Sequence, residues 1–312
     1  MRFLIQIGLV SLLAMFCFSC ASSSDDDDSE SPNADDDNAG GVDDDADDDA
    51  TADDDTWAPL PPPEDALGPT KYPIVLAHGF MGWGYLGPLS NFYLVADTYA
   101  AFGYDVFEPW VSSINSMEVR ANQLANKIDA RYPGQKINII AHSQGGLDAR
   151  YLISTLGWGD RVACLVTLST PHQGASIADF ATGLLPDVAE DAADAMLELL
   201  GMDWDGVTQV TRPYVRDVFN PANPDDERVK YFSFHGNGEE IFAPLQITHA
   251  IIESMEGCND GIIGCESATY GENLGELPTD HFGIVGHPLG FIDFPFMDFY
   301  LDLAVFLRES GC

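Results

Sequence analysis

The sequence predicts a mostly parallel β-sheet covered by helices on both faces, a fold of the α/β class. Short apolar runs alternate along the chain with longer segments whose apolar residues recur at helical spacing. The short runs are almost wholly apolar, which is typical of strands whose two faces are both buried. Strands and helices that alternate in this way form the layers of an α/β domain.

The first elements lie upstream of a Pro-Gly pair at positions 133 and 134. Residues 73–77 form a continuous apolar strand, residues 91–102 have helical apolar spacing, and residues 104–107 are a second short strand. Residues 116–132 form an amphipathic helix, which the Pro-Gly pair ends.

The later elements repeat the same alternation. Isoleucines within residues 137–140 indicate a buried strand, and residues 147–152 indicate the helix that follows it. Residues 161–168 form the next buried strand, and residues 229–234 form another. Residues 296–308 are expected to form a terminal amphipathic helix.

A serine turn follows the strand at 137–140. The residues A-H-S-Q-G-G match the pattern G-x-S-x-G, with Ala141 in place of the first glycine and Gly145 as the second. The flanking positions have to be small because the serine sits on a tight, strained strand-to-helix turn. The turn also places Ser143 at a helix N-terminus, which favours developing negative charge. We interpret Ser143 as a nucleophile; the alternative is an ordinary Ser/Gly helix N-cap.

A nucleophilic serine needs a histidine as base and a carboxylate that orients the histidine. On this kind of fold the chain order is serine, acid, histidine. His281 lies in a loop twenty-one residues after Asp260, which itself sits in an Asn-Asp-Gly turn. We therefore assign His281 as general base and Asp260 as its partner.

The assignment has rivals. His287 is the alternative base, and Asp280 or Glu253 is the alternative acid. A turn around Asp260 with no catalytic role is the structural alternative.

The oxyanion of an acyl-transfer intermediate needs two backbone donors. The N–H of Gln144 follows from the serine turn, and the N–H of Phe80 is the best candidate for the second donor. An aromatic run beside it is expected either to line an acyl groove or to pack in the core; it includes Met81, Trp83 and Tyr85. No cluster has zinc-ligand spacing and no dinucleotide fingerprint is present, so we expect no metal and no cofactor.

Charge divides the chain into two parts. The net charge of −38 argues against a nucleic-acid partner. Residues 25–55 hold sixteen aspartates and one glutamate with no basic residue. Such a tract cannot offset its ordering entropy, so we expect residues 21–69 to be a disordered linker and residues 70–312 to be the catalytic domain. Calcium binding by the aspartate runs is the alternative, but they lack the EF-hand pattern.

The N-terminus is typical of an export signal. An apolar run from Phe3 to Phe18, which follows Met1-Arg2, is too short for a membrane span and predicts a signal peptide at residues 1–20. The residues around Cys20 resemble a bacterial lipobox, in which Cys20 would carry lipid, although Cys17 stands where leucine is usual. We favour an outer-membrane or cell-surface lipoprotein; a secreted protein cleaved after Ala21 is the alternative.

Export implies an oxidising compartment, so four cysteines outside the signal segment are candidates for disulfides: Cys164, Cys258, Cys265 and Cys312. Cys258 and Cys265 flank the Asn-Asp-Gly turn and are the preferred pair. Cys164 lies in an apolar strand, where a buried thiol is the alternative.

Five motifs taken together, in this order, resemble the bacterial true lipases of the Pseudomonas and Burkholderia type: Y-P-I-V-L-A-H-G-F-M-G, A-H-S-Q-G-G, S-T-P-H-Q-G-A, N-D-G-I-I-G and D-H-F-G-I-V-G-H. The resemblance implies an α/β-hydrolase fold, a carboxylic-ester substrate and a helical lid at about 176–205. From the residues alone, an ordinary pair of packing helices explains this segment equally well. It also matches Ser143, Asp260 and His281 to the triad, and Phe80 and Gln144 to the oxyanion donors.

The chain departs from that family at two places. Those lipases carry an aspartate calcium ligand two residues past the catalytic histidine, where this chain has Gly283, so the resemblance argues against a structural calcium ion. The family disulfide joins a cysteine just after the Asp motif to one far upstream. Cys265 lies near that place, but Cys258 is its preferred partner here.

The sequence therefore predicts a tethered serine hydrolase that cleaves long-chain acylglycerol esters through an acyl-enzyme on Ser143. A short-chain esterase or polyester depolymerase is the alternative within enzymes, and a surface lipid-binding or adhesion protein is the non-catalytic one. The expected partners are an ester substrate or lipid–water interface and, through the N-terminal lipid, a membrane. The sequence identifies no foldase.

Overall fold

A six-stranded parallel sheet forms the centre of the molecule. The computed structural model describes residues 68–79, 91–113, 115–183, 207–287 and 294–312. The strand order is β2-β1-β3-β4-β5-β6, and every neighbouring pair is parallel. The strands are β1 (Ile74–Ala77), β2 (Val106–Phe107), β3 (Ile137–His142), β4 (Val162–Leu168), β5 (Lys230–Gly236) and β6 (Glu272–Leu277). The predicted parallel α/β sheet is confirmed.

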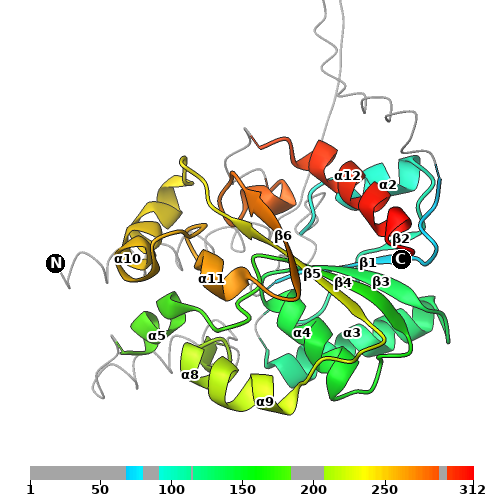
Figure 1. The fold of residues 1–312 in the computed structure, drawn as a ribbon, viewed down its shortest axis with the longest axis horizontal. Helices are drawn as coiled ribbons and strands as arrows, with labels where there is room; N and C mark the ends of the chain where they lie inside the picture. Colours follow the sequence, from blue (N-terminus) through cyan, green and yellow to red (C-terminus); the bar gives the residue numbers. More distant parts are fainter. Residues whose placement is uncertain (1–67, 80–90, 114, 184–206, 288–293) are drawn as a thin grey trace, which may run out of the picture.

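Helices cover both faces of this sheet (Figure 1). One face packs against α2 (Val95–Ala101) and α12 (Phe296–Glu309), whose Tyr99, Tyr300 and Leu307 are fully buried. The other face packs against α3 (Met117–Arg131) and α4 (Gln144–Ser154). The central strands β1, β3 and β4 are buried along their whole length, because both of their faces meet a helix layer.

The amphipathic pattern of α3 explains its place in the fold. Leu124 and Ile128 lie one turn apart and both point into the core. Ser116 caps the helix by accepting a hydrogen bond from the Val119 N–H, and the predicted bounds agree with the observed ones to within one residue.

Shorter elements surround the carboxyl ends of the strands. They are α5 (Ser176–Gly183), α8 (Arg212–Tyr214), η2 (Val215–Phe219), α9 (Asn220–Ala222), η3 (Ala243–Leu245), α10 (Gln246–Glu256), α11 (Cys265–Ala268) and η4 (Gly283–Val285). Of the segment predicted as a lid, about 176–205, the structure describes α5, and residues 184–205 lie outside the described part.

Several predicted boundaries were wrong. The first helix begins at Val95 rather than at residue 91, and the second strand comprises only Val106 and Phe107. The helix after the serine turn begins at Gln144 rather than at residue 147. Gly145 and Gly146, which are typical of a loop, already belong to the helix.

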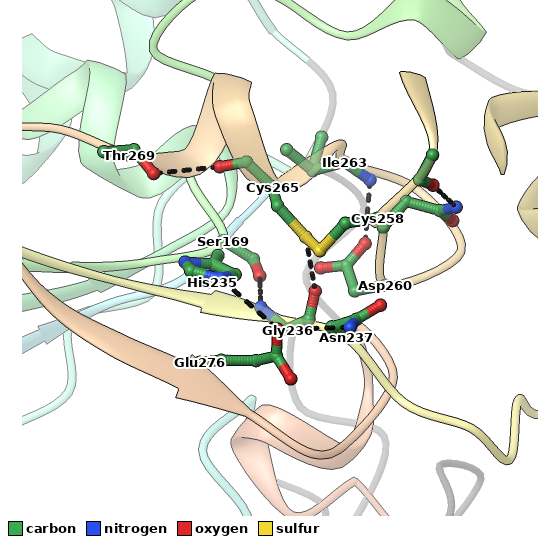
Figure 2. The surroundings of a disulfide bond; sticks show 12 residues. Ser169, His235, Gly236, Asn237, Cys258, Asp260, Ile263, Cys265, Thr269 and Glu276 are labelled. Atoms are coloured by element: carbon green, nitrogen blue, oxygen red, sulfur yellow. Dashed lines mark hydrogen bonds and ion pairs between the residues drawn. A yellow bond between two sulfur atoms is a disulfide. The ribbon is translucent and has the colours of Figure 1, made fainter. Parts of the chain in front are cut away.

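Two disulfides join distant and neighbouring parts of the chain. Cys258 and Cys265 are bonded, as preferred from the sequence, and close a short loop around Asp260 (Figure 2). Cys164 in β4 is bonded to Cys312, so both are disulfide cysteines as the sequence allowed, and the buried-thiol alternative for Cys164 is wrong. A cysteine in an apolar strand looks like any small buried residue, and its partner lies 148 positions away.

The described residues include no helix with the length and apolar character needed to cross a bilayer. The predicted signal segment with Cys20, and the aspartate-rich linker, lie outside the described residues. Disulfides are typical of proteins that fold outside the reducing cytoplasm, which agrees with export.

Candidate active site

Ser143 occupies the strained turn that the sequence predicts, between β3 and α4. Its backbone has φ 55° and ψ −133°, a conformation that is costly for a residue with a side chain. A Cβ at Gly145 would lie 2.4 Å from the Ala77 carbonyl oxygen, so β1 and α4 approach too closely for any side chain there. The Ser143 N–H donates to the Leu168 carbonyl at 2.9 Å. The turn is therefore held between two strands, with the serine partly exposed.

Asp260 and His281 form a buried pair. His281 Nδ1 lies 2.7 Å from Asp260 Oδ2, and the His281 N–H donates to the Asp260 carbonyl at 2.9 Å. The N–H groups of Ile262 and Ile263 donate to Asp260 Oδ1 at 2.9 and 2.7 Å. Burial alone would raise the pKa of Asp260, but His281 and these donors hold it below its ordinary value. Asp260 is therefore ionised at neutral pH and accepts the Nδ1 proton of His281.

His142 connects this pair to the serine turn. It immediately precedes Ser143, and its ring packs against the ring of His281 with the centroids 4.4 Å apart. Burial, followed by the charge of His281, lowers the pKa of His142 well below its ordinary value. His142 thus packs against His281 as a neutral ring. Sequence reasoning missed this role because nothing in the motif indicates where the His142 side chain points.

The rival acids and base have other positions. Asp280 is fully buried and accepts the N–H groups of Phe242, Phe282 and Gly283, so its carboxylate fixes the loop that carries His281. Glu253 is exposed on α10. Burial lowers the pKa of His287, whose ring lies beside Phe282. The acid bonded to His281 is Asp260.

The proposed oxyanion donors are only partly described. Gln144 is the first residue of α4, where backbone N–H groups have no partner within the helix, and it is 1% exposed. Phe80, Met81, Trp83 and Tyr85 lie outside the described residues. The described start of their loop is fixed by His78, whose Nε2 accepts the Val111 N–H at 3.0 Å, so that Nδ1 carries the proton toward the Gly79 carbonyl. Burial and Arg120 lower the pKa of His78 to about 4, which keeps it neutral.

Arg120 holds the same segment at His78 and Gly79 through hydrogen bonds, a role that was not predicted from the sequence. The guanidinium of this fully buried residue donates to the carbonyls of His78, Gly79 and Ser112, and its Nε lies 2.8 Å from Asp148 Oδ2. Burial raises the pKa of Asp148 to about 6, against the opposing pull of Arg120. In the sequence, Arg120 is one charged residue of an amphipathic helix, with no sign that it points inward.

Arg120→Ala is expected to lower the free energy of unfolding by about 3–5 kcal/mol, because it leaves the Asp148 charge buried without a partner. Arg131→Ala is the matched control on the same helix, since Arg131 is about half exposed and pairs weakly with Asp105 at 3.5 Å. The control should change stability by less than about 0.5 kcal/mol. Urea unfolding followed by circular dichroism measures both, and equal losses would contradict the importance of the buried pair.

Metal-ligand geometry occurs once among the described residues, at His235, Cys258 and Cys265. The two cysteines are joined in the disulfide, so their sulfurs are not thiolate ligands in this state. At the position of the calcium aspartate, Gly283 contributes its backbone N–H to Asp280 Oδ1 at 2.8 Å.

Comparisons with known proteins find one thioesterase family model and several lipases. A family model described as palmitoyl protein thioesterase matches residues 73–225. The triacylglycerol lipase of Vibrio cholerae is 33% identical over 247 residues, covering 68% of this chain and 77% of that protein. The triacylglycerol lipase of Pseudomonas fragi is 25% identical over 264 residues, covering 70% of this chain and 89% of that protein. The mature lipase BlEst2 of Bacillus licheniformis superposes with a TM-score of 0.56 at 26% identity, covering 70% of this chain and 88% of that one.

Proposed function

The chain belongs to the bacterial-type triacylglycerol lipase family of α/β-hydrolases and is a lipase-like carboxylic ester hydrolase, and from this premise we propose that Ser143, His281 and Asp260 are its catalytic triad. The observation that carries the proposal is the buried hydrogen bond between His281 and Asp260, with the His281 ring packed on the residue next to Ser143.

In the proposed mechanism, Ser143 Oγ attacks the acyl carbonyl while His281 Nε2 takes its proton. Asp260 accepts the Nδ1 proton of His281, which keeps Nε2 free as the base and stabilises the imidazolium that forms. The backbone N–H groups of Gln144 and Phe80 would bind the oxyanion of the tetrahedral intermediate. His281 then protonates the leaving alcohol, and a water activated by the same imidazole releases the acid from Ser143.

The charges around the triad suit this chemistry. Asp260 is ionised, so the imidazolium at His281 forms beside a negative charge. His142 and His78 are both buried and both have lowered pKa values, so neither adds a positive charge at neutral pH. These features support His281 as the histidine that gains and loses a proton during turnover.

The proposed substrates are long-chain acylglycerols. Support comes from the Vibrio and Pseudomonas relatives, whose names describe triacylglycerol lipases. Met81, Trp83 and Tyr85 are the proposed lining of the acyl groove, because they follow the loop that begins at His78 and Gly79. Short-chain ester or polyester hydrolysis by the same triad is the alternative.

A chain-length series tests this proposal. We expect kcat/KM for p-nitrophenyl esters to rise from acetate to octanoate by about tenfold or more, because each buried methylene contributes up to about 0.8 kcal/mol. The enzyme should also hydrolyse emulsified triolein, measured by fatty-acid titration. A sharp preference for acetate, with no release of oleate, would contradict the long-chain assignment and favour the short-chain esterase.

We also propose that lipid on Cys20 anchors the protein at the cell surface, with residues 21–69 as the extended tether. The composition of the tether supports this, because its aspartates repel one another and favour an extended chain. Metabolic labelling with a radioactive fatty acid should mark the wild-type protein and not Cys20→Ala. Labelling of both, or of neither, would contradict the anchor.

A further inference from the structure

Ser169, at the end of β4, has a backbone conformation that a serine rarely adopts. Its φ is 46°, and among the described non-glycine residues only Leu94 and Ser143 share a positive value. The strain at Ser143 is explained by the serine turn. Glycine would occupy position 169 without strain, so the side chain present there needs another explanation.

The hydroxyl of Ser169 joins the end of β5 to the acid loop. The Gly236 N–H donates to Ser169 Oγ at 3.0 Å, and Gly236 packs so closely under Asp260 that a Cβ at this glycine would lie 2.9 Å from the Asp260 Cβ. Figure 2 shows Ser169, Gly236 and Asp260 together beside the Cys258–Cys265 disulfide. The bond from Gly236 uses an acceptor position of the Ser169 oxygen, so the O–H of Ser169 remains free to act as a donor. Asp260 lies against Gly236, and Ser169 is among the groups that lower the pKa of Asp260.

The Asp260 carboxylate is thus surrounded by donors. The N–H groups of Ile262 and Ile263 donate to Oδ1, and His281 Nδ1 donates to Oδ2. A buried carboxylate is costly unless its oxygens are hydrogen-bonded, and it can accept about four such bonds. Ser169 is 1% exposed and Asp260 is 0% exposed, so water does not readily take the place of the hydroxyl.

We propose that Ser169 is a positioning residue for ester hydrolysis, a role that rests on the proposed function: its hydroxyl accepts from Gly236 and donates to Asp260, and so holds the carboxylate in the orientation that serves His281. A glycine at position 169 would avoid the backbone strain of the positive φ, but it would lack the hydroxyl that this role requires. Ser169 acts through Asp260 and does not touch the substrate.

Two substitutions separate this role from that of a turn residue. Ser169→Gly relieves the backbone and removes the hydroxyl, whereas Ser169→Ala removes the hydroxyl and keeps the strain. We expect kcat to fall by roughly tenfold in both, with KM within about twofold of wild type, since one hydrogen bond to a charged group is lost. The melting temperature of Ser169→Gly should equal or exceed that of Ser169→Ala. If Ser169→Gly retains the kcat of wild type, the residue serves only the turn and the proposal is overturned.

A pH profile adds a readout that a structural role would not move. Loss of the hydroxyl raises the pKa of Asp260, so activity that needs the ionised carboxylate should be lost at a higher pH in both variants. Ser233→Ala is the matched control: Ser233 is a fully buried serine in β5 whose hydroxyl accepts the Tyr270 N–H at 2.9 Å. It should lower the melting temperature and leave kcat and the pH profile unchanged. An equal shift of the profile in the control would overturn the proposal.

The wild-type protein and the Ser169 variants together distinguish failure of the proposed ester hydrolysis from failure of the proposed role of Ser169. Wild-type protein that neither hydrolyses esters nor reacts with a fluorophosphonate would remove the proposed function and, with it, the role of Ser169. Active wild-type protein with fully active Ser169 variants would remove only the role of Ser169.

Discussion

Ser143→Ala is expected to lower kcat for ester hydrolysis by about a millionfold, because the acyl-enzyme cannot form without the hydroxyl. The turn around Ser143 is built by Gly145 and by hydrogen bonds of the backbone, none of which uses the Ser143 hydroxyl. The variant should therefore fold normally and melt near the wild-type temperature. Hydrolysis of p-nitrophenyl butyrate, together with labelling by a fluorescent fluorophosphonate, measures the loss.

Ser154→Ala is the control for this experiment, since Ser154 lies at the other end of α4. It should retain both the activity and the label. Activity of Ser143→Ala within a factor of about ten of wild type would show that another residue is the nucleophile. Absence of label in the wild-type protein would favour the non-catalytic lipid-binding alternative.

Asp260→Asn is expected to lower kcat by about ten-thousandfold. The N–H groups of Ile262 and Ile263 donate to Asp260 Oδ1, so in the variant they favour the rotamer that places the amide oxygen of asparagine at this position. The amide NH₂ then faces His281 Nδ1, which favours the tautomer with its proton on Nε2. That tautomer cannot accept a proton from Ser143. Steady-state kinetics across pH measure the loss.

Asp280→Asn distinguishes the two buried carboxylates that precede His281. Asp280 holds three backbone N–H groups, so its substitution should lower stability while kcat stays within about tenfold of wild type. The opposite ranking of the two variants would show that Asp280 is the catalytic acid. The ionised Asp260 also stabilises the fold at neutral pH, because its pKa is lowered, and this contribution is lost as pH falls through the folded value.

Much of the fold could be predicted because local and tertiary signals agree. The strands β1, β3 and β4 are continuous apolar runs and are buried on both faces. The serine turn could be recognised because small residues are required where Gly145 meets the Ala77 carbonyl. Chain order left several candidates, and the positions of Asp260 and His281 in their loops, together with the family resemblance, favoured this pair; the two residues are hydrogen-bonded in the structure.

The parts that escaped prediction lack a local signal. Strand β6 is an edge strand with the sequence E-N-L-G-E-L and is mostly exposed, so it shows no apolar run. The helix α10 follows a loop and was not anticipated. The inward direction of Arg120 and the left-handed backbone of Ser169 arise only when distant segments meet, and no spacing along the chain reveals them.

The Cys164–Cys312 bond makes a covalent ring of the second half of the chain, and Asp260 and His281 lie inside it. A protease that cuts any peptide bond within this ring opens it without releasing a fragment, because both pieces stay joined through sulfur. Nicked molecules would thus travel as one species until a reductant separates them. A protein that works among extracellular proteases gains a tolerance of single cuts in its loops that no hydrogen bond could provide.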